Sequence, residues 1–230
     1  MKDYIKVIGF DADDTLFINE PYFDEAEEKF CALFEDFLSK QSISQTLFQT
    51  QINNLPFYGY GIKGYILSMI EAANTISDGK VSIKVTEKIL EIGKELLQKP
   101  IVLLDGIEDT LKQLHGKYKL IVVTKGDLKD QHRKVSLSGL GPYFHHIEVL
   151  SEKDEIDYEK LLKRLDIDAS DFLMIGNSLK SDVLPVLNIG GTAIHIPFHT
   201  TWAHERIDHE IVHDKFYTAI TNAEILPLLL

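Results

Sequence analysis

Residues 7–16 read Val7-Ile8-Gly9-Phe10-Asp11-Ala12-Asp13-Asp14-Thr15-Leu16, and this stretch decides the fold. Its first four residues are typical of a short buried strand, and three carboxylates then follow within four positions. Like charges this close disfavour ionisation unless a cation or a shared proton lies among them. Because open α/β sheets place their sites at the carboxyl ends of strands, we expect Mg²⁺ as that cation. The alternative is an acidic turn that only caps the next helix.

Composition and charge exclude several classes of protein. The 230 residues include 24 basic and 36 acidic ones, and the net charge of -12 argues against generic attraction to nucleic acid or to anionic membranes. No apolar run is long enough to span a bilayer, and the charged N-terminus lacks a signal-peptide pattern. Cys31 is the single cysteine, and we expect it to be buried on the apolar face of a helix. A cytoplasmic location is the simplest expectation.

Between Pro21 and Leu97 the sequence predicts helices and no strands. The first helix carries one apolar stripe at spacings of three and four residues, formed by Phe23, Ala26, Phe30, Phe34 and Phe37. Three further amphipathic segments follow, at residues 44–55, 62–73 and 85–96. Four such helices in succession can pack as a small bundle.

From Pro100 onward, apolar strands alternate with helices. The strands are expected at residues 119–124, 146–151, 172–176 and 192–196, in addition to the one that begins at Val7. This alternation predicts an α/β fold, a Rossmann-like parallel sheet with helices on both faces. The second strand arrives only after Pro100. We therefore expect a core domain of residues 1–17 and 100–230, with residues 18–99 inserted as a helical domain that lies above the strand ends as a lid.

Polar side chains follow the carboxyl end of nearly every predicted strand. Since parallel strands end at one edge of the sheet, residues far apart in the sequence can meet there. Together they supply carboxylates, a hydroxyl and ammonium groups, an inventory that fits phosphoryl transfer. The residues are Asp11 and Asp13, then Thr124 and Lys125, then Lys153, then Asn177 and Asp182.

These residues form four motifs: Asp11-Ala12-Asp13-Asp14-Thr15, Thr124-Lys125-Gly126, Lys153, and Gly176-Asn177-Ser178 through Asp182. In this order they resemble the motifs of the haloacid dehalogenase-like hydrolase superfamily, a family mostly of phosphatases. The resemblance covers residues 4 to 17 and 100 to about 215, and the insert stands where the family has its helical type 1 cap. Three positions depart from the usual pattern. Asn177 replaces a frequent acid, Asp14 replaces a frequent glycine, and no proline follows Lys153.

The resemblance implies a role for each motif. Asp11 would attack the phosphorus of a phosphate monoester and form an aspartyl phosphate. Asp13 would protonate the leaving alcohol and then deprotonate water, and we expect nearby negative charge to raise its pKa for the first step. Mg²⁺ would be held by the carboxylates of Asp11 and Asp182 and by the backbone carbonyl of Asp13.

The same resemblance assigns phosphate binding to Thr124, Lys125 and Lys153, and alternatives stay open for each. Thr124 could be only a strand-end hydroxyl, Lys125 could face substrate or solvent, and Lys153 could be a solvated surface lysine. Asn177 and Ser178 could simply cap a helix, with Asp182 set against nearby backbone. The histidines offer no repeated ligand set, so we interpret them as loop residues rather than as a zinc site.

The function expected from these motifs is an Mg²⁺-dependent phosphatase acting on a small phosphorylated metabolite. Dehalogenases of the superfamily keep the nucleophile but do not need an acid two positions later, so Asp13 favours phosphate chemistry. A phosphomutase, or a non-catalytic member that binds a phosphorylated ligand or a protein, is the alternative. We expect Tyr58, Tyr60 and Lys63, in a glycine-rich turn, to face the site and select substrate, unless that turn only joins helices.

Overall fold

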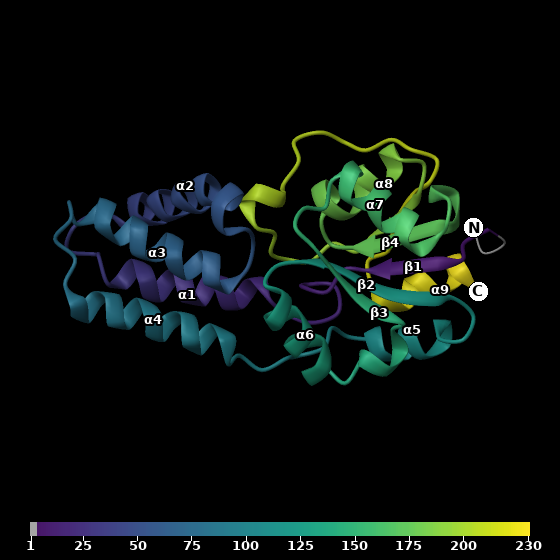
Figure 1. Cartoon of the computed structure of the whole chain (residues 1–230), viewed down its shortest axis with the longest axis horizontal. Helices are drawn as coiled ribbons and strands as arrows, with labels where there is room; N and C mark the ends of the chain where they lie inside the picture. The colour runs from purple at the N-terminus through teal and green to yellow at the C-terminus, as the bar shows by residue number, and fades with distance from the viewer. Residues whose placement is uncertain (1–3) are drawn as a thin grey trace. The chain divides into compact units, whose positions relative to one another are not determined.

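The computed structural model describes residues 4–230, which form two compact units. One unit comprises residues up to Glu20 together with Ile101–Leu230, and the other comprises Pro21–Pro100 (Figure 1). Residues 1–3 of the predicted core domain lie outside the described residues. In the part of the chain that is described, no helix is long and apolar enough to cross a membrane.

The core unit is built on a sheet of six parallel strands in the order β3-β2-β1-β4-β5-β6. The strands are β1 (Val7–Phe10), β2 (Lys119–Lys125), β3 (His146–Leu150), β4 (Phe172–Gly176), β5 (Thr192–His195) and β6 (Phe216–Thr218). The five predicted strands are confirmed to within one residue at each end. The sixth was not predicted, because β6 is only 3 residues long and carries too little pattern to be read from sequence.

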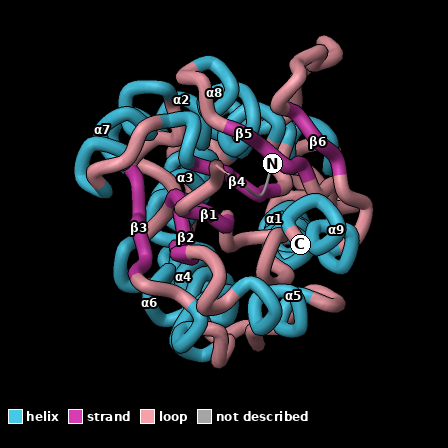
Figure 2. Tube along the Cα trace, turned by 90° about the vertical axis from the view of Figure 1, so that its right-hand side faces the viewer, coloured by secondary structure: helices cyan, strands magenta, loops and turns pink. Residues whose placement is uncertain are grey.

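Both faces of the sheet are covered by helices, so the predicted fold class is confirmed. Side chains alternate between the two faces, so that Ile8 and Phe10 pack on one side and Val7 on the other. Helices α5 (Ile107–Leu114), α6 (Leu128–Leu137) and α9 (Leu226–Leu229) cover the first face, and α7 (Glu155–Leu165) and α8 (Leu184–Asn188) cover the second (Figures 1 and 2). Single turns η1 (Gly141–Tyr143), η2 (Ala169–Asp171), η3 (Leu179–Val183), η4 (Ala203–Glu205) and η5 (Asn222–Ile225) lie in the connections.

The helical unit consists of the four predicted helices, which share a core of their own. They are α1 (Glu20–Ala32), α2 (Lys40–Tyr58), α3 (Ile62–Ile76) and α4 (Ile83–Leu97). Cys31 is buried in this core, as expected. The predicted stripe of the first helix extends too far, because α1 ends at Ala32 and Phe37 is 55% exposed. The chain has to turn there so that α2 can begin after Ser39, whose hydroxyl accepts the N–H of Ser42 and caps the helix.

Candidate active site

Asp11 stands at the carboxyl edge of the sheet between two central strands. Its N–H donates to the carbonyl of Ile175 at 2.9 Å, which extends the pairing of β1 with β4 by one residue. This bond fixes the backbone of Asp11 beside the end of β4, where the strand order changes direction and ligands bind in such sheets. The carboxylate is buried, and its Oδ2 accepts the hydroxyl of Thr15 at 3.2 Å.

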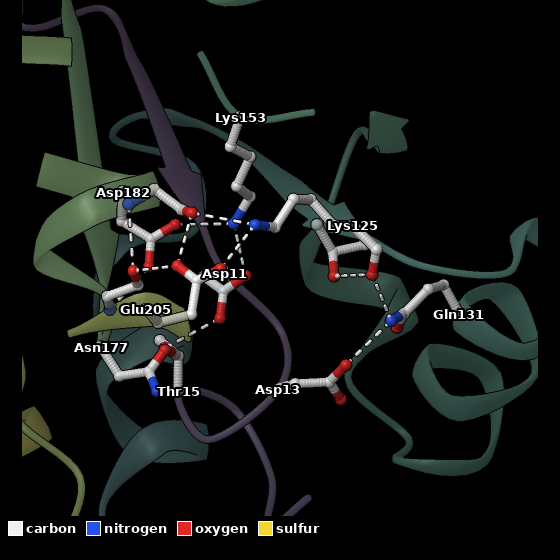
Figure 3. Close-up of polar contacts among 12 residues, drawn as sticks. Asp11, Asp13, Thr15, Lys125, Gln131, Lys153, Asn177, Asp182 and Glu205 are labelled. Atoms are coloured by element: carbon white, nitrogen blue, oxygen red, sulfur yellow. Dashed lines mark hydrogen bonds and ion pairs between the residues drawn. The ribbon is translucent and has the colours of Figure 1, made fainter. Parts of the chain in front are cut away.

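Lys153 joins Asp11 to Asp182. Its Nζ donates to Oδ1 of Asp11 at 2.5 Å and to Oδ1 of Asp182 at 2.6 Å (Figure 3). Only 2% of the Lys153 side chain is exposed, so it is not the solvated surface lysine that the sequence left open. Because Lys153 follows β3, three separate strand ends contribute to this group.

The electrostatics of this group call for a further cation. Burial raises the pKa of Asp11, and the ammonium of Lys153 opposes that rise. Burial also disfavours the charge on Lys153, but the carboxylates of Asp11 and Asp182 outweigh it and raise the pKa of the lysine. When Asp11 is ionised, two carboxylates face one ammonium, and the excess negative charge in a buried place favours a bound cation.

Asp182 lies in a π-helical turn, η3, that follows β4 after Asn177 and Ser178. The Oδ2 of Asp182 accepts the N–H of Ser178 at 2.9 Å, and the hydroxyl of Ser178 accepts the N–H of Ser181 at 3.0 Å. Gly176 leaves room for this arrangement, because a Cβ there would lie 2.2 Å from Oδ2 of Asp182. Short π-helical turns are frequent at functional sites, and this one aims a carboxylate at Lys153.

The donor set at this edge suits a hard divalent cation. Carboxylate and carbonyl oxygens are the protein ligands that Mg²⁺ prefers. Asp11 and Asp182 supply two carboxylates, and both contact the same ammonium, that of Lys153. Within residues 4–230, no group of three or more His, Cys, Asp or Glu side chains is placed to hold a metal ion. Any metal held here therefore needs backbone, water or substrate oxygens in addition to the two carboxylates.

Asp13 points away from Asp11 and has a separate set of partners (Figure 3). Its Oδ1 accepts from Nζ of Lys134 at 2.5 Å and its Oδ2 from Nε2 of Gln131 at 2.8 Å. An ammonium and an amide, rather than another acid, are in direct contact with this carboxyl group. Gln131 and Lys134 are one turn apart on α6, so both point to the same carboxylate.

The side chain of Asp14 has partners different from those of Asp11 and Asp13. Its backbone is left-handed, with φ 58°, and its carboxylate accepts the N–H groups of Asn19 and Glu20. Burial raises the pKa of Asp14 to about 7. Of the three acids, Asp11 contacts Lys153, whereas the side chains of Asp13 and Asp14 contact other groups. The contacts of Asp14 agree with the capping alternative, since Glu20 is the first residue of α1 and Asn19 directly precedes it.

The remaining phosphate-binding candidates lie at the end of β2. The hydroxyl of Thr124 is buried and donates to the carbonyl of Lys125 at 3.3 Å. Nζ of Lys125 donates to Oε1 of Glu205 at 2.8 Å and to the hydroxyl of Ser181 at 2.9 Å. Only 13% of the Lys125 side chain is exposed, so it points toward the carboxylate of Glu205 rather than into solvent (Figure 3).

Tyr58, Tyr60 and Lys63 belong to the helical unit and are described within it. Tyr58 ends α2, and its hydroxyl donates to Oε1 of Glu71 on α3 at 2.6 Å. Tyr60 lies in the connection between α2 and α3, and Lys63 lies in the first turn of α3. That these residues face the site stays a prediction.

Three contacting residues escaped the sequence analysis: Gln131, Lys134 and Glu205. Gln131 and Lys134 follow the predicted strand end at Thr124 by 7 and 10 residues. At that distance the sequence alone does not show which face of the helix points to the site. Glu205 lies in the loop after β5, whose end is at the same edge as the other site residues. That rule would have pointed to the loop, but not to one carboxylate within it.

Comparison with known proteins agrees with this architecture. The sequence pattern described as haloacid dehalogenase-like hydrolase matches residues 5–190. The chain belongs to the haloacid dehalogenase-like hydrolases. A crystal structure of a haloacid dehalogenase-like family hydrolase from Xanthomonas campestris is 35% identical, with a TM-score of 0.88, and the match covers 98% of this chain and 92% of that one.

Two further proteins to which the chain is similar carry different names. N-acylneuraminate-9-phosphatase of Mus musculus is 24% identical over 125 residues, which are 52% of this chain and 50% of the mouse protein. The chain thus matches about half the length of this curated relative. 2-Haloacid dehalogenase from Pseudomonas syringae pv. Tomato DC3000 shares the fold, at 20% identity and a TM-score of 0.64, with 98% of each chain covered. The fold alone therefore does not decide between hydrolysis of a phosphate ester and cleavage of a carbon–halogen bond.

Proposed function

We propose that this haloacid dehalogenase-like hydrolase is an Mg²⁺-dependent phosphatase that hydrolyses a small phosphorylated metabolite through an aspartyl phosphate. The observation that carries the proposal is the buried arrangement of Asp11, Lys153 and Asp182 at the carboxyl edge of the sheet. It offers a nucleophilic carboxylate beside an ammonium that can neutralise an incoming phosphate. The similarity to a mouse phosphatase supports the same chemistry.

In the first half of the proposed reaction, an oxygen of Asp11 attacks the phosphorus of the ester. The phosphorus–oxygen bond to the alcohol breaks, and the leaving oxygen takes a proton from the carboxyl group of Asp13. In the second half, Asp13 takes a proton from water while that water attacks the phosphorus and releases Asp11. Lys153, which contacts Asp11 in the structure, offsets the negative charge that gathers on the phosphoryl oxygens.

Mg²⁺ would be held by the carboxylates of Asp11 and Asp182 and by the backbone carbonyl of Asp13. When bound, it supplies positive charge that neutralises the nucleophile and the phosphoryl oxygens. Thr124 and Lys125 would hold the phosphate from the end of β2. Asp13 has to leave Gln131 and Lys134 for its proton to reach the leaving oxygen, since its carboxylate now points toward α6.

We propose in addition that residues 18–99 act as the cap that selects the substrate, with Tyr58, Tyr60 and Lys63 among the selecting residues. Tyr60→Ala should change the ratio of kcat/KM values across a substrate panel. Tyr4→Ala, which alters an exposed tyrosine of the core unit, is the matched control. Unchanged selectivity in Tyr60→Ala would remove this residue from the proposal.

The deciding experiment measures phosphate release from sugar phosphates, nucleotides, phosphoglycolate and an aryl phosphate, with Mg²⁺ and with a chelator. Asp11→Asn should abolish the metal-dependent release, whereas Asp109→Asn, at an exposed acid of α5, should leave it intact. Halide release from a 2-haloacid without phosphate release would replace the proposal with a dehalogenase. Isomer formation without phosphate release would replace it with a phosphomutase.

A further inference from the structure

Glu205 is a largely buried carboxylate that none of the four motifs contains and that the proposed reaction does not use. It lies on η4, in the loop after β5, and 14% of its side chain is exposed. Oε1 accepts from Nζ of Lys125 at 2.8 Å. Oε2 accepts the hydroxyls of Ser178 and Ser181, each at 2.5 Å. These partners come from the ends of two other strands, β2 and β4, so Glu205 links three strand ends.

The contacts around Glu205 close on themselves. Nζ of Lys125 also donates to the hydroxyl of Ser181 at 2.9 Å, so the ammonium, the hydroxyl and the carboxylate contact one another in a ring. The hydroxyl of Ser178 caps the turn by accepting the N–H of Ser181, while the N–H of Ser178 donates to Asp182. Glu205 therefore contacts Lys125 directly and is linked to Asp182 through Ser178.

The negative charge on Glu205 pairs with the positive charge on Lys125. Burial acts to raise the pKa of Glu205, but the Lys125 ammonium and the two serine hydroxyls outweigh it and lower the pKa to about 2. The carboxylate is thus ionised at neutral pH. A negative charge here opposes the attraction of a phosphate to Lys125, so its benefit to the site must come from placement rather than from affinity.

We propose that Glu205 is a positioning residue, which fixes the ammonium of Lys125 and the turn from Ser178 to Asp182 for a phosphate ester bound at Asp11. The inference rests on the proposed phosphatase function. A preoriented cation and carboxylate lower the barrier of the chemical step, because they need no rearrangement when charge develops. Loss of Glu205 should therefore lower kcat without weakening the binding of phosphate.

The first test measures the placement of Lys125 without any turnover. The folded protein is acetylated with acetic anhydride, and the rate at Lys125 is compared by mass spectrometry with that at Lys112, an exposed lysine of α5. In Glu205→Gln the relative rate at Lys125 should rise about 5-fold or more, because the ammonium loses the carboxylate contact that holds it in place. Glu210→Gln, at an exposed acid of the same loop, should leave that rate unchanged.

The second test separates placement from affinity. Glu205→Gln should lower kcat by about 10- to 100-fold, while inorganic phosphate binds by calorimetry at least as tightly as to the unaltered protein. In a double-mutant cycle, Glu205→Gln should cost little further in a Lys125→Met background, because both changes remove the same placement. If Glu205→Gln does not fold, Ser181→Ala takes its place, since it removes the hydroxyl that both partners contact.

Each outcome decides the inference. Weaker phosphate binding together with lower kcat would show a merely structural role, and an unchanged acetylation rate or fully additive losses would also overturn it. If the unaltered protein releases no phosphate from any ester, the proposed function is wrong. The acetylation rates would still decide whether Glu205 holds Lys125.

Discussion

The carboxylate of Asp13 contacts the ammonium of Lys134 at 2.5 Å, although the two residues are 121 positions apart. Only 8% of the Lys134 side chain and 23% of the Asp13 side chain are exposed, so water screens the pair incompletely. Asp11 has its own lysine, Lys153, also at 2.5 Å. Asp11 and Asp13, two positions apart in the sequence, are thus held by different lysines.

The first prediction concerns this pair. Lys134→Met should lower the free energy of unfolding by about 1–3 kcal/mol, because it leaves a half-buried carboxylate without its cation. The loss should be smaller in an Asp13→Asn background, where no charge remains to be compensated. Urea unfolding of the four proteins in this cycle measures the coupling. Lys129→Met, at an exposed lysine on the same helix, is the control, and equal losses in both backgrounds would contradict the pairing.

The second prediction concerns the metal. Saturating Mg²⁺ should raise the melting temperature, with about 2.7 kcal/mol of stabilisation at a concentration 100 times the dissociation constant. Asp182→Asn should lose most of this increment, because it removes one of two carboxylates that contact Lys153. Differential scanning calorimetry with Mg²⁺ and with a chelator compares the increments rather than the absolute stabilities. An increment of equal size in Asp182→Asn and in Asp109→Asn would rule out Asp182 as a ligand.

The motifs could be found from sequence because strand ends of a parallel sheet share one edge. Asp11, Lys153 and Asp182 follow three predicted strands, and the structure brings them within direct contact. What could not be predicted is side-chain direction. Asp13 and Asp14 follow the same strand as Asp11, yet their side chains contact other partners. Asp13 contacts Lys134 on α6, and Asp14 accepts a backbone N–H at the start of α1. A sequence shows that charges are close along the chain, but not which of them share a partner.

The third prediction concerns the turn at Asp14. Asp14→Ala should lower the free energy of unfolding by about 2–3 kcal/mol. The variant loses hydrogen bonds to two amides, and alanine adopts the left-handed backbone conformation at φ 58° less readily than aspartate. Asp14→Asn should cost about 1 kcal/mol or less, since asparagine tolerates this conformation and still accepts one N–H. Thermal unfolding by circular dichroism ranks the variants. Equal losses for alanine and asparagine would show that the negative charge, not the conformation, matters.

The fourth prediction is the pH dependence of the Glu205 contact. The pKa of Glu205 is lowered to about 2 in the folded protein from an ordinary value of 4.5. A lowered pKa stabilises the folded state above the unfolded pKa, and the contribution is lost as the pH falls toward 2. The depression corresponds to about 3 kcal/mol near pH 7 and to roughly half of that or less near pH 3. Glu205→Gln should therefore be less stable than the unaltered protein at neutral pH, and the two urea-unfolding free energies should converge in acid. Other acids titrate in both proteins and cancel in the difference, so a gap that stays constant with pH would show that Glu205 contributes through packing rather than through its charge.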